Sequence, residues 1–432
     1  MVSRDTLSLV DLAARIAADA KKLQQRLETI GHPQPSFAPD TPAIYPDDAE
    51  AQAARMKLIT AALDLYGLAT GPRDFIVWDA FLSKHDTMTF DVLNEFNFWH
   101  AVPIDNSASY AEIAQRTGLE EAVVRAVLRL SMSRRVFAEG QDGHIVHTAV
   151  SAAMTRDRLL QSWIGHHLQD VAPGCVQFAR HLRANGGRSS TDPAKSAVAE
   201  TLGGRALFDV LEAEGDGWRM RRFAEAMASM KSSSHDLEHV HAGFDWGGLG
   251  KGATVVDVGG SGGHVSASLA AAHPGLRFVV QDLPSVEAEY AAAVPEELRD
   301  RVKFQVHDFF AEQPERGATV YLLRHILHDW PDSQAVAVLR RLVAAMRPGE
   351  GGSRIVIMDV VMAGHGTVPL PLERVQSCMD LQMRVALCAH ERTRAQWEEL
   401  LKESDSRLKL KGLVVPPGCA GAVMEVVLED ER

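Results

Sequence analysis

Residues 254–263 read TVVDVGGSGG, and this stretch decides how the C-terminal half of the chain folds. A short run of β-branched residues predicts a buried strand, and the glycines after it predict a tight turn. Similar runs recur further along the chain and alternate with helical patterns. This alternation predicts an α/β domain with a doubly wound, mostly parallel sheet covered on both faces. The later strands are expected in RFVVQD (277–282), VKFQVHD (302–308), TVYLLRHI (319–326), RIVIMDV (354–360) and AVMEVVLE (422–429).

Polar residues follow each of the first five predicted strands. In an open parallel sheet, ligands bind outside the carboxyl ends of the strands, so these residues are expected to gather on one rim. They are the glycine loop after Asp257, then Asp282, Asp308, the His328-Asp329-Trp330 triplet and Asp359. The sequence therefore predicts a ligand site at this edge of the sheet.

The glycine loop favours an adenosyl cofactor over a dinucleotide. An acidic residue about 20 positions after such a loop suits the two hydroxyls of a ribose, and Asp282 follows Gly260 at that spacing. The loop itself runs Gly-Gly-Ser-Gly-Gly-His, which is not the GxGxxG of a dinucleotide-binding turn. A nicotinamide oxidoreductase is therefore only a distant alternative.

The region before the sheet is helical and contains a pattern typical of a winged helix. Ser109 can cap a helix, Thr117-Gly118 makes a turn, and a second helix leads to a hairpin. That shape suggests DNA binding, but the second helix carries few basic residues and the chain has a net charge of -12. Proteins that bind nucleic acid need clustered Lys and Arg, so this partner is not expected.

Composition narrows the remaining classes. The chain has 432 residues, which favours two domains, and four scattered cysteines without a CxxC pair, which fit neither a disulfide framework nor a zinc site. The N-terminus alternates apolar and charged residues and lacks the apolar block of a signal peptide or membrane span. We therefore expect a soluble, cytoplasmic protein without a membrane partner.

Several separated motifs resemble one enzyme family. DVGGSGGH, VVQDLP, HILHDWPD and the Glu391-Arg392-Thr393 triplet, 32 residues after Asp359, are similar to plant O-methyltransferases of the caffeate and flavonoid type, class II. FDWGGLG, RLVAAMRPG and RLKLKGLVVPPG resemble the fungal secondary-metabolite branch. The resemblance implies a Rossmann-like fold, S-adenosylmethionine as methyl donor with S-adenosylhomocysteine as product, no metal, and a phenolic acceptor, with an aromatic polyketide as the expected class.

The resemblance also implies roles for individual residues. His328 is expected to be the general base, oriented by Asp359 and Glu391. The cofactor is expected to contact a set on the rim: Gly259, Gly260, Gly262, Asp282, Asp308, Phe309, Arg324 and Trp330. Arg324 stands where relatives often carry lysine. Met227, Met230 and Met383 are candidates to line the acceptor pocket, although plain core packing explains a methionine equally well.

The proposed chemistry needs such residues for reasons independent of the resemblance. A phenol titrates near pH 10, so at neutral pH a base must take its proton as the oxygen attacks the methyl group. A histidine, with a usual pKa near 6.5, suits this task. A carboxylate at the other ring nitrogen fixes the tautomer and stabilises the imidazolium.

Domain limits and partners complete the expectations. We expect an N-terminal helix and linker over residues 1–48, a mostly α-helical winged-helix-like dimerisation domain over 49–165, and the catalytic domain over 166–432. In relatives a neighbouring subunit completes the acceptor pocket, which predicts a homodimer.

Two rival functions stay open. Some fungal members of this lineage resemble pericyclases that bind the cofactor and steer a cyclisation without moving a methyl group, and a fold alone never settles function. The second rival is a winged-helix regulator with an adenosyl-binding effector domain. The set of His328 with two carboxylates favours methyl transfer, because a pericyclase does not need this base.

Overall fold

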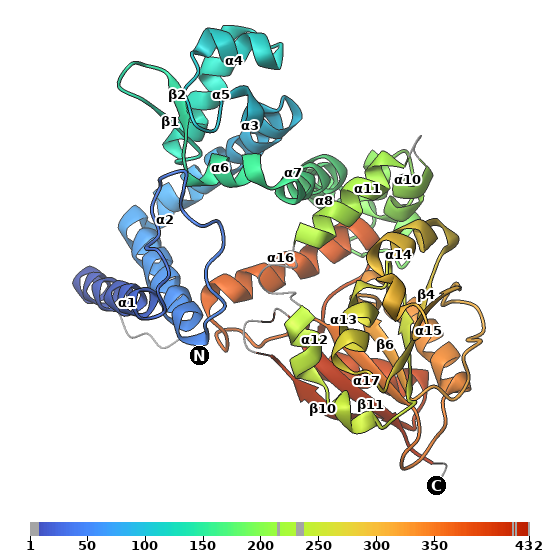
Figure 1. Cartoon of the computed structure of the whole chain (residues 1–432). Coiled ribbons are helices and arrows are strands. Elements are labelled where there is room, and N and C mark those ends of the chain that lie inside the picture. The colour runs from blue at the N-terminus through green and yellow to red at the C-terminus, as the bar shows by residue number, and fades with distance from the viewer. Residues whose placement is uncertain (1–7, 214–216, 230–236, 417–418, 420, 431–432) are drawn as a thin grey trace. The chain divides into compact units, whose positions relative to one another are not determined.

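The computed structural model describes residues 8–213, 217–229, 237–416, 419 and 421–430 (Figure 1). The chain divides into two compact units. The first contains residues 1–176, 208–232 and 366–373, and the second contains 177–207, 233–365 and 374–432. The predicted boundary at residue 165 falls inside the first unit, at the end of α7 (Arg158–Gly165). The three predicted domains remain a prediction.

The second unit is built on a seven-stranded sheet with the order β10-β11-β7-β6-β3-β4-β5. Its strands are β3 (Thr254–Val258), β4 (Arg277–Asp282), β5 (Val302–Val306), β6 (Val320–Arg324), β7 (Arg354–Asp359), β10 (Leu408–Val414) and β11 (Ala422–Leu428). Neighbours from β7 to β5 are parallel, and β11 is antiparallel to both of its neighbours. The predicted strands and the predicted mostly parallel sheet are confirmed. Strand β10 was not predicted.

Both faces of this sheet are covered, as expected for a doubly wound fold. Successive residues of a strand point to opposite faces, and Val255 and Val256 accordingly belong to different core clusters. The cluster with Val256 contains residues of α15 (Asp332–Ala345) and α17 (Arg394–Ser404). The cluster with Val255 contains residues of α12 (Leu237–Gly243) and α13 (His264–Ala272).

Shorter elements complete the second unit. They are η2 (Pro193–Lys195), α9 (Ala197–Thr201), η4 (Gly247–Leu249), η5 (Pro284–Val286), α14 (Glu287–Ala293), η6 (Glu296–Leu298), η7 (Leu327–Asp329), β8 (Val361–Met362) and β9 (Arg392–Thr393). Strands β8 and β9 pair in parallel outside the main sheet. Helices α8 (Ala172–Ala184), α10 (Leu207–Ala213) and α16 (Leu370–Leu387) each have residues in both units.

The first unit is helical. It contains α1 (Leu9–Thr29), α2 (Ala49–Glu95), α3 (Phe98–Ala101), α4 (Tyr110–Thr117), α5 (Glu121–Ser133), β1 (Phe137–Glu139), β2 (Ile145–His147), α6 (Ala149–Arg156), α7, the π-helical η1 (His166–Val171) and α11 (Trp218–Ser229). Ser109 caps α4 through a capping box with Glu112, and Gly118 ends it at a φ of 72°. The predicted cap and turn are therefore present, and β1 pairs with β2 as an antiparallel hairpin.

The second helix of this unit, α2, is interrupted part-way along its length. It runs from Ala49 to Glu95 across a kink. Gly71 adopts a φ of 74° and Pro72 follows it. Proline has no backbone N–H to donate, and glycine tolerates positive φ, so the helix breaks there and resumes in a new direction. Among the described helices, none is long and apolar enough to cross a membrane.

Candidate active site

The turn after β3 is shaped by steric demands on its glycines. Gly259 has a φ of 70°, a conformation that residues with a Cβ rarely adopt. At Gly260 an added Cβ would lie 2.6 Å from the carboxyl carbon of Asp257. Asp257 is itself buried and accepts a hydrogen bond of 2.7 Å from the Ser266 hydroxyl. Burial raises the pKa of Asp257 to about 6, although this hydrogen bond opposes the shift.

Asp282, the last residue of β4, faces this turn. Its Oδ2 accepts a hydrogen bond of 2.8 Å from the backbone N–H of Ser261, and its Oδ1 accepts one of 2.8 Å from Leu283. Burial raises the pKa of this carboxyl group, and the two backbone donors counteract the rise. A carboxylate has about four lone-pair sites, so further hydroxyls can still bind to it. The donor set therefore fits the ribose of an adenosyl cofactor.

Aromatic side chains gather beyond β5 and β6. Phe309 lies 5.9 Å from Trp330 between ring centroids, and Phe310 lies 4.8 Å from Trp330, both edge to face. Asp308 begins this segment and accepts a hydrogen bond of 2.9 Å from the Phe310 N–H. Arg324 ends β6, and burial lowers the pKa of its guanidinium, while Asp257 and other acids oppose this. The structure thus provides flat apolar surfaces and polar groups on the same rim.

His328 and Glu391 meet although 63 residues separate them. His325 adopts a left-handed φ of 54°, which turns the chain sharply between β6 and η7. The Nδ1 of His328 lies 2.9 Å from the Oε1 of Glu391. The Glu391 side chain is fully buried, and 13% of the His328 side chain is exposed. Because a carboxylate only accepts hydrogen bonds, Nδ1 carries the proton and the neutral ring presents Nε2 as its base.

Carboxylates dominate the electrostatics around this histidine. Burial by itself lowers the pKa of His328, but Asp329, Glu391 and Asp359 together raise it to about 10. The Oδ1 of Asp329 lies 3.5 Å from Nε2. Burial raises the pKa of Asp329 to about 6, and the nearby imidazolium counteracts this. The carboxylates of this cluster therefore favour the protonated, positively charged imidazole of His328.

Asp359 lies in the same cluster but does not contact His328 by a hydrogen bond. It is completely buried, and neither of its oxygens accepts a hydrogen bond from the described residues. Its Oδ1 lies 3.8 Å from the Nδ1 of His325. One ligand atom each of His325, His328 and Asp359 fall within 4.8 Å of one another, a spacing that could accept a metal ion. The metal-free site of our sequence analysis remains a prediction.

The candidate methionines Met227 and Met383 differ in exposure and in the compact unit to which they belong. Met383 lies on α16 and is 7% exposed. Met227 lies on α11 in the other compact unit and is 37% exposed. Met230 lies outside the described residues. Contact of any of them with an acceptor remains a prediction.

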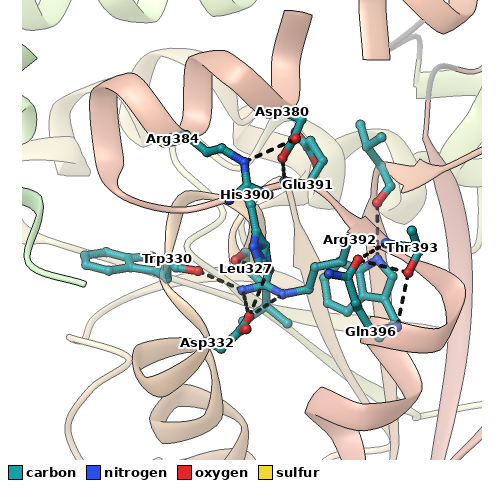
Figure 2. Close-up of polar contacts among 12 residues, drawn as sticks. Leu327, Trp330, Asp332, Asp380, Arg384, His390, Glu391, Arg392, Thr393 and Gln396 are labelled. Carbon is teal, nitrogen blue, oxygen red and sulfur yellow. Dashed lines mark hydrogen bonds and ion pairs between the residues drawn. The ribbon is translucent and has the colours of Figure 1, made fainter. Parts of the chain in front are cut away.

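Two residues near the pair were not singled out by sequence reasoning. The Oδ1 of Asp380 accepts a hydrogen bond of 3.1 Å from the backbone N–H of Glu391 (Figure 2). Arg392, the next residue, is completely buried. Arg392 stands inside the Glu391-Arg392-Thr393 motif, whereas Asp380 lies outside every motif quoted above, and motif letters do not reveal contacts with backbone groups.

Comparison with known proteins places this arrangement in a family. Residues 199–405 match a family model described as an O-methyltransferase domain. O-methyltransferase pgmB of Aspergillus terreus is 36% identical over 435 residues, which cover 97% of this chain and 96% of that protein. This chain belongs to the O-methyltransferase family. Its predicted enzyme class and its predicted cofactor, S-adenosylmethionine, are thereby confirmed.

Other fungal relatives of this O-methyltransferase cover nearly the whole chain. O-methyltransferase aurJ of Gibberella zeae is 35% identical, covering 98% of each protein. Chlorophenol O-methyltransferase of Trichoderma longibrachiatum is 32% identical, covering 97% of this chain and 90% of that enzyme. The predicted likeness to fungal secondary-metabolite enzymes is thus supported, while the plant caffeate branch remains a resemblance.

Solved structures share the fold of this O-methyltransferase. A structure described as a pericyclic reaction enzyme has a TM-score of 0.74 at 23% identity and covers 96% of this chain and 99% of its own. OxaC in complex with SAH and oxaline has a TM-score of 0.74 at 24% identity, covering 97% of this chain and 100% of its own. The Rossmann-like methyltransferase fold with an N-terminal helical region is therefore confirmed.

Proposed function

We propose that this O-methyltransferase transfers a methyl group to a phenolic hydroxyl of a secondary metabolite, with His328 as general base and without a metal. The single observation that carries the proposal is the 2.9 Å contact between His328 Nδ1 and the buried Glu391. An aromatic polyketide is the acceptor class we favour. A fungal relative named for chlorophenol methylation supports a phenolic acceptor.

The rim residues divide the work of binding. When bound, the cofactor supplies an electrophilic methyl group on a positively charged sulfur. Asp282 would hold the ribose hydroxyls, and the turn at Gly259, Gly260 and Gly262 lets the backbone approach closely. Asp308 and Phe309 would address the adenine, Trp330 would pack against the cofactor, and Arg324 would lie near it.

His328 would remove the phenolic proton as the oxygen attacks. Without a bound cofactor the His328 imidazolium has a pKa of about 10, close to that of a phenol, so proton transfer between the two would be nearly balanced. A positively charged cofactor on the same rim would lower this pKa and favour the neutral ring, whose Nε2 could then accept the proton. Glu391 then stabilises the imidazolium that forms. Positioning of oxygen and methyl carbon can contribute about 7 to 11 kcal/mol.

Asp359 acts on this pair through charge. It makes no hydrogen bond to the ring, but its carboxylate helps to raise the pKa of His328. We therefore assign Glu391 the orienting role and Asp359 an electrostatic one. Met383 is the remaining described candidate of the second unit for the acceptor pocket.

We also propose that two copies associate into a homodimer in the cytoplasm. The support is a band of apolar side chains on α2, each between 42% and 66% exposed: Phe75, Ile76, Val77, Trp78, Phe81 and Leu82. Monomeric proteins rarely leave so many large apolar side chains in one exposed stretch.

The decisive experiment compares wild type with His328→Ala on a panel of phenolic polyketides. General-base catalysis typically contributes about 10²- to 10⁴-fold, so we expect the variant to lose that much of kcat while retaining cofactor affinity by calorimetry. The neutral imidazole becomes more abundant as pH rises toward 10, so wild-type kcat/KM should increase with pH above neutrality. His100→Ala, at an exposed histidine of α3, serves as the control.

Three other results would contradict the proposal. Wild-type turnover in the His328→Ala variant would show that His328 is not the general base. Loss of activity on adding a chelator would show that a metal takes part. Cofactor binding with a cyclised, unmethylated product would favour the pericyclase alternative, whose support is the shared fold at 23% identity.

A further inference from the structure

Arg392 is a buried cation that no step of the proposed mechanism uses. It has no exposed surface and begins the two-residue strand β9, where it pairs with Val361 of β8. Burying a charge is costly unless hydrogen bonds and an opposite charge satisfy it. The partners of this guanidinium therefore show what its burial achieves.

Those partners lie on both sides of His328. The Nη1 of Arg392 donates a hydrogen bond of 2.8 Å to the carbonyl of Leu327, and Nη2 donates one of 2.8 Å to the carbonyl of Trp330 (Figure 2). One guanidinium thus ties down the residue before His328 and the residue two positions after it. The short helix η7 that carries the imidazole is held at both ends.

The charge of Arg392 is balanced on the solvent side. Its Nε donates a hydrogen bond of 2.9 Å to the Oδ1 of Asp332, and Nη2 lies 2.7 Å from the same oxygen. Asp332 is 53% exposed and begins α15. On the inner side, the guanidinium carbon lies 5.1 Å from the ring centroid of Trp397. The planar fork of arginine can serve these partners together, whereas the point charge of lysine cannot.

The other end of this connection is Glu391, the neighbour of Arg392 in the chain. Its backbone N–H is held by Asp380, and Thr393 on the far side caps α17 by accepting from the N–H of Gln396. The segment that carries the carboxylate and the turn that carries the imidazole are thus joined directly through Arg392 (Figure 2).

We propose that Arg392 is a positioning residue for proton transfer, which keeps the Nδ1 of His328 in register with Glu391. The inference rests on the proposed role of His328 as base. Arg392 itself touches neither reacting atom in this assignment. It acts by holding the backbone carbonyls of Leu327 and Trp330 and by pairing with the carboxylate of Asp332.

The test is Arg392→Lys, which keeps the positive charge but loses the planar guanidinium that donates to several acceptors at once. Outer-shell groups that orient metal-bound histidines contribute about 10- to 100-fold, and we expect a fall in kcat of similar size here, with the KM for S-adenosylmethionine within about twofold of wild type. If Glu391 no longer contacts the ring, the acid limb of the pH profile should move to lower pH. Asp332→Asn should change kcat in the same direction by a smaller factor, and it serves if the first variant fails to fold. The control is Arg394→Lys, whose arginine is 66% exposed and pairs with Glu398.

The proposal is overturned if Arg392→Lys lowers the melting temperature but keeps kcat and the pH profile of wild type. It is also overturned if kcat falls while the pH profile stays fixed and Asp332→Asn behaves like wild type, because a purely structural role predicts that pattern. Failure of the base assignment is distinguishable, since His328→Ala would then retain activity whatever Arg392→Lys does.

Discussion

At the scale of one residue, the buried carboxyl group of Asp359 lowers the stability of the fold when it is charged. The side chain is completely buried, neither oxygen accepts a hydrogen bond from the described residues, and burial raises its pKa to about 7. His328 and Arg392 lower this pKa, but Glu391 and Asp329 add to the rise. Active sites commonly retain such costly groups, and relieving them tends to stabilise the fold and impair the reaction.

We therefore expect Asp359→Asn to be more stable and less active. In the folded wild type the Asp359 carboxyl group keeps its proton up to about pH 7, whereas an aspartic acid in the unfolded chain loses its proton near pH 3.9. Wild type therefore loses stability as pH rises between these values, and the advantage of the variant should grow over that window and level off above it. We expect on the order of 1 kcal/mol at pH 8 and none near pH 4.

Denaturant unfolding at pH 4, 6 and 8 measures this difference, and initial rates at pH 8 measure the loss of activity. Asp405→Asn is a suitable control, because Arg407 holds the pKa of Asp405 below its usual value. The control should lose stability at pH 8. An Asp359→Asn variant that is less stable than wild type at pH 8 would show that the charged form of this carboxylate is stabilised in the folded state.

At the scale of elements, the turn between β3 and α13 predicts different effects for alanine substitutions at two nearby glycines, Gly260 and Gly262. A Cβ at Gly260 would lie 2.6 Å from the Asp257 carboxyl carbon, whereas a Cβ at Gly262 would be 3.4 Å from the Glu289 backbone, an ordinary contact. Gly260→Ala should therefore cost about 1 to 3 kcal/mol of stability and weaken cofactor binding about tenfold or more. Gly262→Ala should cost less than about 1 kcal/mol. Calorimetry and thermal unfolding of both variants test this, and equal losses would argue against the close packing.

The same scale shows where sequence patterns succeed. Strands such as β3 are apolar runs that end in glycine or aspartate. A strand of a parallel sheet that is covered on both faces reads as a continuous apolar run, so these strands could be predicted from the sequence. The glycine turn and Asp282 followed from the rule for parallel sheets. Strand β10 alternates leucine with lysine and so carries a strand pattern that our expectation left unused, whereas the two-residue strands β8 and β9 are too short to be recognised.

The site itself was only partly predictable. His328 and Glu391 could be connected through a family motif, because spacing alone says nothing about two residues that are 63 positions apart. Arg392 could not be assigned a role, since two of its acceptors are backbone carbonyls, which every residue has. Nor could the missing hydrogen bonds of Asp359 be foreseen, because they depend on the packing of several elements.

At the scale of the whole molecule, the chain does not divide at a single point. Residues 208–232 and 366–373 belong to the first compact unit, although residues of the second unit flank them in the chain. Sequence patterns locate elements along the chain. They do not reveal which compact unit a helix packs into when the chain passes from one unit to the other and back. The expected domain limits at residues 48 and 165 follow one another along the chain and remain a prediction, whereas the two compact units interleave.

The exposed apolar band of α2 leads to the prediction for the assembled molecule. A dimer would have a mass of about twice 47.1 kDa, and it would cover side chains such as Ile76 and Phe81, which are 66% and 60% exposed in one copy. Burying them favours association, because removing apolar surface from water contributes about 25 cal/mol per Å² before the entropic cost of association is subtracted. Ile76→Glu combined with Phe81→Glu places charges where a partner must pack, so light scattering should show a monomer. Val176→Glu, at a position that is 85% exposed on α8, should leave the dimer intact. A wild-type protein that remains monomeric at micromolar concentration, or a double variant that remains dimeric, would mean that this band has another purpose.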